Sequence, residues 1–146
     1  MNPCRSVLFT LLVLAAGACS HHHHPDEARL AVTTRDGRRI EGRLVFDLDE
    51  SETTETLDAP SNGIDYTLPF GLVSTIDLHA GAPRASVTLH SGEQLQLNLS
   101  GDLGSNNAGM LIFTSDAKQP EYVRWSNVAQ IQLDRPPAMY PPFNKP

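Results

Sequence analysis

The sequence repeats itself with a period of 55 residues, and this repeat limits the possible folds more than any other feature. When residue n is written against residue n+55 without a gap, ten positions are identical. Most of the identities fall on a glycine and on apolar positions typical of a core: Arg29/Arg84, Val32/Val87, Thr33/Thr88, Gly37/Gly92, Leu44/Leu99, Asp47/Asp102, Leu48/Leu103, Val73/Val128, Ile76/Ile131 and Leu78/Leu133. A fixed register of this kind indicates a duplicated structural unit. We therefore expect two copies, residues 29–80 and 81–134.

Both copies have the two-residue alternation of β-strands. Asp36-Gly37 and Ser91-Gly92 are typical of hairpin turns. We expect strands over residues 30–35, 38–47, 65–70 and 73–78 in copy one, with an acidic loop from 47 to 65. In copy two we expect strands over 84–90, 93–99, 110–114, 122–125 and 128–133, with Val87, Leu89, Leu95, Leu97 and Leu99 on one face. After residue 18 no stretch of twelve residues has a helical period, so the predicted class is all-β.

A copy of about 50 residues buries too little apolar surface to be comfortably stable alone. We therefore expect the copies to pack together with approximate two-fold pseudo-symmetry, by sharing apolar faces or pairing edge strands. Phe70 and Trp125 occupy equivalent positions and are the expected members of the shared core.

Each copy resembles the small SH3-like barrel of Sm-like proteins. In copy one the resemblance is carried by residues 32–37 and by Gly42, Leu44, Phe46 and Asp47, and in copy two by residues 123–128 and Ile131. It implies five short strands with a tight turn before the last strand. The predicted fold is thus two tandem SH3-like β modules.

RNA binding, which the Sm-like family performs, is not expected here. The family uses an asparagine after the second strand and an arginine–glycine pair before the last. Ser51 replaces that asparagine in copy one, although copy two has Asn106, and Pro69 replaces the arginine. Phe70 and Trp125 replace the glycine. With 17 acidic against 11 basic residues and a net charge of −6, the chain also has the wrong sign for a nucleic-acid partner.

The N-terminus has the pattern of a secretion signal. Arg5 precedes an apolar run over residues 7–16, which is shorter than the roughly twenty residues of a spanning helix. Ala16-Gly17-Ala18 satisfies the rule for ordinary signal peptidase. Read together with Cys19, the same stretch resembles the lipobox of bacterial lipoproteins.

The lipobox resemblance implies removal of residues 1–18 and lipid on the thiol of Cys19. Ser20, in place of aspartate, implies the outer membrane, with the protein facing the periplasm. Cys4 leaves with the signal, so Cys19 has no intramolecular partner for a disulfide. We expect lipidation at Cys19, with ordinary signal cleavage as the alternative.

A histidine run lies in the expected tether, residues 19–28. Imidazole groups ligate zinc, copper or nickel, but a flexible run without preset geometry binds weakly. A solvated spacer, weak transition-metal capture and an introduced tag are the three interpretations, and we favour the spacer. The residues concerned are His21, His22, His23 and His24.

A proline-rich tail, residues 135–146, ends the chain. Met139, Tyr140 and Phe143 stand between its prolines. Such a segment tends toward extended polyproline II. We expect it to dock on the β domain, with an exposed ligand for a partner as the alternative.

Catalytic signals are sparse in this sequence. No G-x-S-x-G, H-E-x-x-H, C-x-x-C or P-loop spacing occurs. His79 and His90 are expected on the surface. The acidic stretch from Asp47 to Asp58 has Glu52 where an EF-hand requires glycine, so a solvated loop is expected, with weak calcium binding as the alternative.

These observations predict a non-enzymatic outer-membrane lipoprotein. It would serve as a periplasmic binding or structural module of the cell envelope, attached to the membrane by lipid, without a cofactor and without nucleic acid. An envelope protein or polymer is the expected partner. The alternative is a periplasmic metal-capturing lipoprotein that uses the histidine run and the acidic loop.

Overall fold

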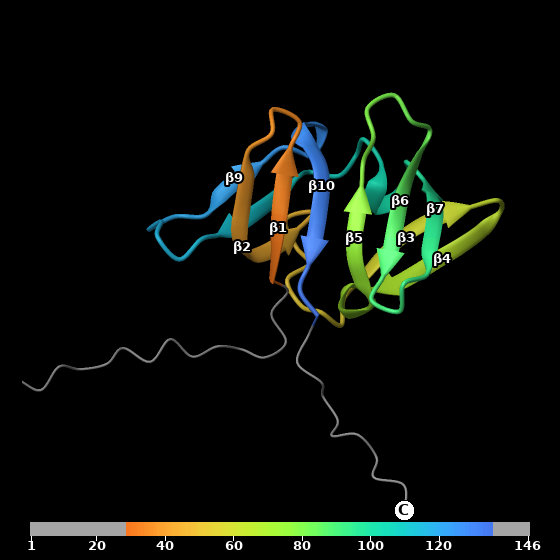
Figure 1. Cartoon of the computed structure of the whole chain (residues 1–146), viewed down its shortest axis with the longest axis horizontal. Helices are drawn as coiled ribbons and strands as arrows, with labels where there is room; N and C mark the ends of the chain where they lie inside the picture. The colour runs from red at the N-terminus through yellow and green to blue at the C-terminus, as the bar shows by residue number, and fades with distance from the viewer. Residues whose placement is uncertain (1–28, 136–146) are drawn as a thin grey trace, which may run out of the picture.

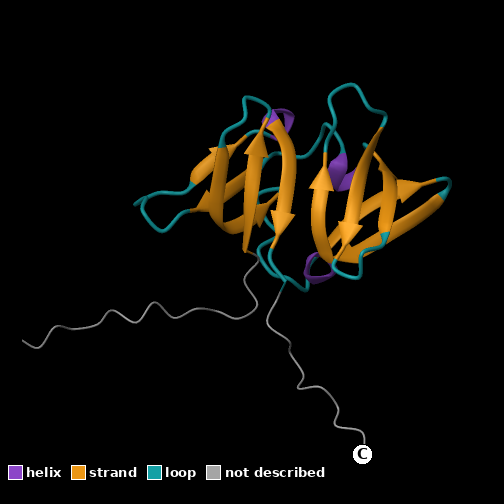
Figure 2. Cartoon of the chain, in the orientation of Figure 1, coloured by secondary structure: helices purple, strands orange, loops and turns teal. Residues whose placement is uncertain are grey.

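The computed structural model describes residues 29–135, which form ten β-strands and three short 3-10 helices (Figures 1 and 2). This part of the chain contains no α-helix, so the predicted all-β class is confirmed. The elements in chain order are β1 (Arg29–Thr34), β2 (Arg39–Phe46), β3 (Thr56–Ser61), β4 (Ile64–Pro69), η1 (Phe70–Leu72), β5 (Val73–Asp77), β6 (Arg84–Leu89), β7 (Gln94–Asn98), η2 (Gly101–Leu103), β8 (Met110–Phe113), β9 (Glu121–Val123), η3 (Trp125–Asn127) and β10 (Val128–Leu133).

Eight of the strands form one antiparallel sheet in the order β7-β6-β5-β10-β1-β2-β8-β9, and β3 and β4 form a separate hairpin. The strands gather into two lobes that lie side by side (Figure 1). We call one of them the β1 lobe, and it contains β1, β2, β8, β9 and β10. The other, the β6 lobe, contains β3 to β7. The β6 lobe includes the hairpin, because β3 lies against β7.

The two lobes do not correspond to the two halves of the sequence. β1 pairs with β10, β2 pairs with β8, and β5 pairs with both β6 and β10, and each of these pairings joins a strand before residue 80 to one after it. At the centre of the sheet Ile76 lies opposite Ile131, and these residues are 55 positions apart in the sequence. The β1 lobe therefore contains strands from both halves.

Most elements recur at the offset of 55 residues. η1 and η3 correspond residue for residue, and the pairings of β1 with β2 and of β6 with β7 have the same register at that offset. The expected gapless register is wrong in one segment. Leu57 pairs with Leu68 on the β3–β4 hairpin, whereas Met110 pairs with Val123 on β8–β9, so β8 follows β3 at an offset of 53.

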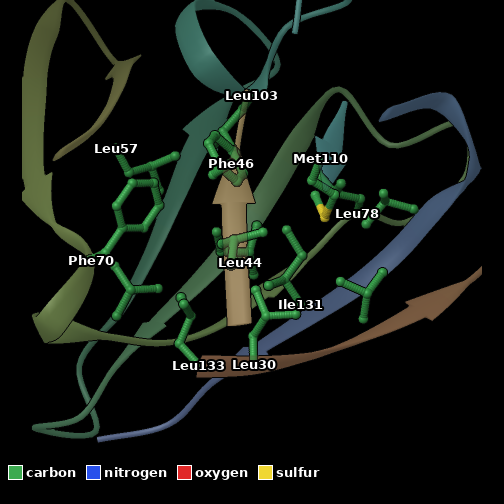
Figure 3. Close-up of a cluster of buried hydrophobic side chains, with 14 of the residues drawn as sticks. Leu30, Leu44, Phe46, Leu57, Phe70, Leu78, Leu103, Met110, Ile131 and Leu133 are labelled. Atoms are coloured by element: carbon green, nitrogen blue, oxygen red, sulfur yellow. The ribbon is translucent and has the colours of Figure 1, made fainter. Parts of the chain in front are cut away.

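One continuous hydrophobic core joins the two lobes. Phe70 and Trp125 are buried, as the sequence predicts. Phe46 contacts both, with ring centroids 5.1 Å from Phe70 and 5.6 Å from Trp125. Figure 3 shows Phe46 and Phe70 among buried leucines from several strands. Because one aromatic side chain touches both equivalent positions, packing couples the lobes.

Two further sequence expectations need correction. β3 lies inside the segment predicted as an acidic loop. The sequence pattern does not reveal this strand, because its buried residues Leu57 and Ala59 are interrupted by Asp58 and Pro60. Leu99, expected on the buried face, is 41% exposed because β7 ends at Asn98.

The predicted signal peptide, Cys19, the histidine run and residues 136–146 of the tail lie outside the described residues. Between residues 29 and 135, no helix has the length and apolar character needed to cross a membrane.

Candidate functional site

A pocket of about 390 Å³ is lined by residues of both lobes and of the segments that connect them. It lies at the end of the sheet where β1 and β5 end and β10 begins, since Arg35, Leu78 and Ser126 line it. The start of β1 and the end of β10 lie at the opposite end (Figure 1). The described part of the chain therefore begins and ends far from this pocket, which we call the interlobe pocket.

Two arginines from the β1 lobe supply the positive charge of the interlobe pocket. Arg35 follows β1, and its backbone N–H donates to the carbonyl of Asn127 at 2.7 Å. Its side-chain Nε donates to the carbonyl of Ser126 at 3.0 Å. Arg124 immediately precedes η3. The connection between β1 and β2 is thus bonded to η3, which brings both guanidinium groups to one pocket.

Neither of these arginines forms an ion pair with an acidic residue between residues 29 and 135. Other arginines of the same turn region do, because Arg38 pairs with Glu121 and Arg39 pairs with Glu41 at 2.9 Å. The charges of Arg35 and Arg124 are therefore not neutralised by side chains of the described part.

Apolar side chains form the rest of the pocket wall. Leu78, Leu103 and Trp125 are buried residues whose edges reach the pocket. Leu99 is 41% exposed and extends the apolar wall outward. The pocket thus combines cationic groups with an apolar surface, a combination typical of ligand sites.

The connection between β7 and β8 closes the pocket with polar residues. Asn107 is 6% exposed, and its side-chain amide donates to the carbonyl of Asp102 at 2.8 Å. The oxygen of the same amide accepts from the backbone N–H of Gly109 at 2.7 Å. Because both ends of this buried amide are bonded, the loop that carries Ser105 into the pocket has a fixed path.

A second, smaller pocket of about 250 Å³ shares the same two arginines. Asp36 and Arg38 line it together with Arg35 and Arg124. A hydrogen bond from the Thr34 hydroxyl, followed by a backbone bond from Arg38, lowers the pKa of Asp36 below its ordinary value. Arg35 and Arg124 therefore line two adjoining hollows.

A separate cluster of acidic residues lies around the connection between β2 and β3. Burial, followed by the charges of Asp49 and Asp102, raises the pKa of Glu50 to about 7. Burial also raises the pKa of Asp102. Glu50 Oε2 is buried without a hydrogen-bond partner. Within the described ranges, no three His, Cys, Asp or Glu side chains are placed to hold a metal ion.

The structure places the two predicted surface histidines differently. His79 is exposed and lines the interlobe pocket. His90 is half-buried, and its Nε2 is buried without a partner, so its prediction as a plain surface residue is wrong. This burial follows from the strand pairing, because the backbone N–H of His90 donates to the carbonyl of Leu72 at 2.8 Å and holds the turn against η1.

Arg35 and Arg124 were not identified from the sequence. The only available signal is that neither arginine recurs at the offset of 55 residues, where His90 and Pro69 stand. Nothing in either residue's local pattern indicates that they line one pocket.

Comparisons of the chain with protein-family models, with curated proteins and with solved structures give no match.

Proposed function

We propose that this protein is a non-enzymatic, lipid-anchored binding module of the cell envelope, with the interlobe pocket as its binding site. The observation that carries the proposal is the pocket itself, where Arg35 and Arg124, without acidic partners in the described part, meet the apolar surface of Trp125. A concave surface with a few charged groups and an apolar wall is the usual form of a ligand site.

The position of the pocket supports a role at a membrane surface. The proposed lipid site, Cys19, precedes Arg29 by ten residues, and β1 begins at the end of the sheet opposite the pocket (Figure 1). A protein anchored there would present the pocket away from the outer membrane, toward the periplasm. A partner in the envelope, protein or polymer, could then reach it.

A binding role is favoured over a hydrolytic one by the surroundings of the histidines. Nucleophilic catalysis needs a base within hydrogen-bond reach of a serine, cysteine or threonine. Between residues 29 and 135 the only histidines are His79 and His90, and neither imidazole forms a hydrogen bond with such a side chain.

We further infer that the fold arose by duplication of an SH3-like unit and exchange of strands between the copies. The pairing of Ile76 with Ile131 supports an approximate two-fold axis between these residues, because each is the counterpart of the other. The pairing of Val32 with Ile131 likewise recurs as Val87 with Ile76. Each lobe has five strands with a one-turn helix before β5 or β10, which supports the SH3-like interpretation.

Site-specific photo-crosslinking in cells tests the proposed binding role. A crosslinking amino acid at Leu99, in the pocket wall, is expected to trap a partner of the envelope. The same amino acid at Leu72, which is 53% exposed at the opposite end of the sheet, is the matched control. Adducts of equal yield at both positions, or none at Leu99, would contradict the proposal.

A further inference from the structure

We infer that the ligand of the interlobe pocket is a carboxylate that carries an apolar group. Arg35 and Arg124 bind the carboxylate, and Trp125 and Leu99 contact the apolar group. This inference rests on the proposed binding function and adds the chemical class of the ligand.

The two guanidinium groups account for the negative charge of the ligand. The chain as a whole is acidic, with 17 acidic and 11 basic residues, so two arginines left without acidic partners in the described part are not a consequence of excess base. The Nε of Arg35 is bonded to the carbonyl of Ser126, which orients the guanidinium plane before a ligand arrives. An oriented guanidinium donates two parallel hydrogen bonds to a carboxylate.

The apolar wall indicates that the ligand is more than a small inorganic ion. Leu99 is 41% exposed beside the arginines, whereas Leu44, its counterpart 55 residues earlier, is 1% exposed. A phosphate or sulfate ion would leave the surfaces of Leu99 and Trp125 in water. A ligand with an apolar group covers them, and that burial favours binding.

The size of the pocket fits one end of a ligand. A volume of about 390 Å³ is near the lower limit for small-molecule sites. A carboxylate with one aliphatic side chain matches such a space. Two sources share this chemistry, the C-terminal residue of a peptide and a free acylated amino acid or short fatty acid.

The corresponding positions of the other copy show that the fold itself does not require this chemistry. The counterparts of Arg35 and Arg124 are His90 and Pro69, and the counterpart of Ser105 is Glu50. Asp134 and Glu52 stand at the counterparts of two further lining residues, His79 and Asn107. The pair of pocket arginines therefore has no equivalent at the corresponding positions of the other copy.

The binding test uses the protein's own fluorescence, because Trp125 is the only tryptophan in the chain and lines the pocket. The purified full-length chain is titrated with N-acetyl-leucine, with octanoate and with a short peptide that ends in leucine. We expect a saturable change in Trp125 emission with at least one of them. N-acetyl-leucinamide, which lacks the carboxylate, is expected to give none, and inorganic phosphate is expected to bind more weakly.

The three carboxylate probes separate the possible sources. A preference for the peptide assigns a protein C-terminus, and a preference for octanoate or N-acetyl-leucine assigns a free acid; both support the inference. Equal binding of N-acetyl-leucinamide, or binding of phosphate alone, would overturn it.

Charge variants test the role of the arginines. Arg124→Gln is expected to raise the Kd of the best probe about tenfold, since a charge-assisted hydrogen bond is lost. Lys118→Gln removes the same charge from the exposed loop between β8 and β9 and is expected to leave the Kd unchanged. Circular dichroism of each variant establishes that it is folded.

An unchanged Kd in a folded Arg124→Gln variant would overturn the assignment of the carboxylate to this pocket. The proposed binding function fails separately. A partner crosslinked at Leu99 without any carboxylate binding would leave the function standing and remove only the ligand class.

Discussion

The two lobes share the order of three strands, β10-β1-β2 in one and β5-β6-β7 in the other, but they differ where β2 and β7 end. In the β1 lobe, β2 has eight residues, and the last four of them pair with β8. In the β6 lobe, β7 has five residues, and β3 does not join it in the sheet. A hydrogen bond from the Ser61 hydroxyl to the carbonyl of Gln96, at 2.6 Å, links β3 to β7 instead.

The difference follows from one pair of counterparts, Phe46 and Gly101. Phe46 is the last residue of β2 and fills the core between the lobes. Gly101 has φ +60, and a Cβ at this position would lie 2.3 Å from the carbonyl oxygen of Asp58. The glycine therefore allows β3 to approach closely and starts η2 where β2 continues as a strand.

Each lobe has two leucines in this segment, four residues apart, and the change of path reverses which of the two is buried. Leu44 is 1% exposed and Leu48 is 43% exposed, whereas their counterparts Leu99 and Leu103 are 41% and 1% exposed. The same apolar pattern thus supplies a core residue in one lobe and a pocket wall in the other. Apolar residues at corresponding positions can therefore lie in the core of one lobe and line a pocket in the other.

The largest expected loss of stability comes from the aromatic contact between the lobes. Phe46→Ala is expected to lower the free energy of unfolding by about 3–5 kcal/mol, because a fully buried ring is lost next to Phe70 and Trp125. Trp125→Ala is expected in the same range. Urea denaturation followed by circular dichroism measures both. A loss for Phe46→Ala no larger than that for Phe113→Ala, a half-buried ring on β8, would mean that the lobes are not coupled through this residue.

The leucine pairs test the reversal directly. Leu103→Ala is expected to cost about 2–5 kcal/mol and Leu48→Ala less than about 0.5 kcal/mol. For the other pair, Leu44→Ala is expected to be costly and Leu99→Ala nearly neutral. Thermal or urea unfolding of the four variants gives the ranking. Equal costs within either pair would refute the reversal.

Gly101, the position at which the two lobes differ, is expected to tolerate no side chain. Gly101→Ala should destabilise by about 2–4 kcal/mol, because a left-handed backbone and an overlap with the Asp58 carbonyl both oppose a Cβ. Gly37 also has a left-handed backbone, with φ +85, but an added Cβ would meet open space. We therefore expect Gly37→Ala to lower the free energy of unfolding by only about 1–2 kcal/mol. If the two variants unfold at the same urea concentration, the close approach of β3 is not what requires Gly101.

The smallest effect is a dependence of stability on pH. The pKa of Glu50 is raised from 4.5 to about 7, so the folded protein binds this proton more tightly than the unfolded chain. The resulting stabilisation is complete below pH 4.5 and is lost as the pH rises through about 7. The raised pKa of Asp102 acts in the same direction.

Glu50→Gln is expected to flatten the decline of Tm over this pH range. The exposed Glu93→Gln in the β6–β7 turn serves as the matched variant, for which we expect the decline to remain. A wild-type Tm that rises with pH across this range, or a slope unchanged in Glu50→Gln, would contradict the assignment.

The sequence predicted the class and much of the core, because alternation of apolar residues reports which side of a strand is buried. Phe70 and Trp125 were identified in this way. β3 was missed, since Asp58 and Pro60 interrupt the apolar signal of Leu57 and Ala59. Alternation does not report which strand lies beside which, so the pairing of β1 with β10 could not be predicted.

The candidate site could not be predicted for the same reason. Arg35 and Ser126, which are bonded in the pocket, are 91 residues apart in the chain. Only the pairing across the two halves brings them together. In the sequence Arg35 stands beside a polar turn and Arg124 is one polar residue between apolar ones. Neither local pattern indicates which residue lies next to it in the fold.

Cross-strand nuclear Overhauser effects between backbone protons are the most direct test of the strand pairing between the two halves of the sequence, which brings the pocket residues together. We expect contacts of Val32 and Ile76 with Ile131, and of Val87 with Ile76. Two modules that each closed on their own strands would instead show contacts of β1 with β5 and of β6 with β10. Observation of that second set, without the contact between Ile76 and Ile131, would contradict the account.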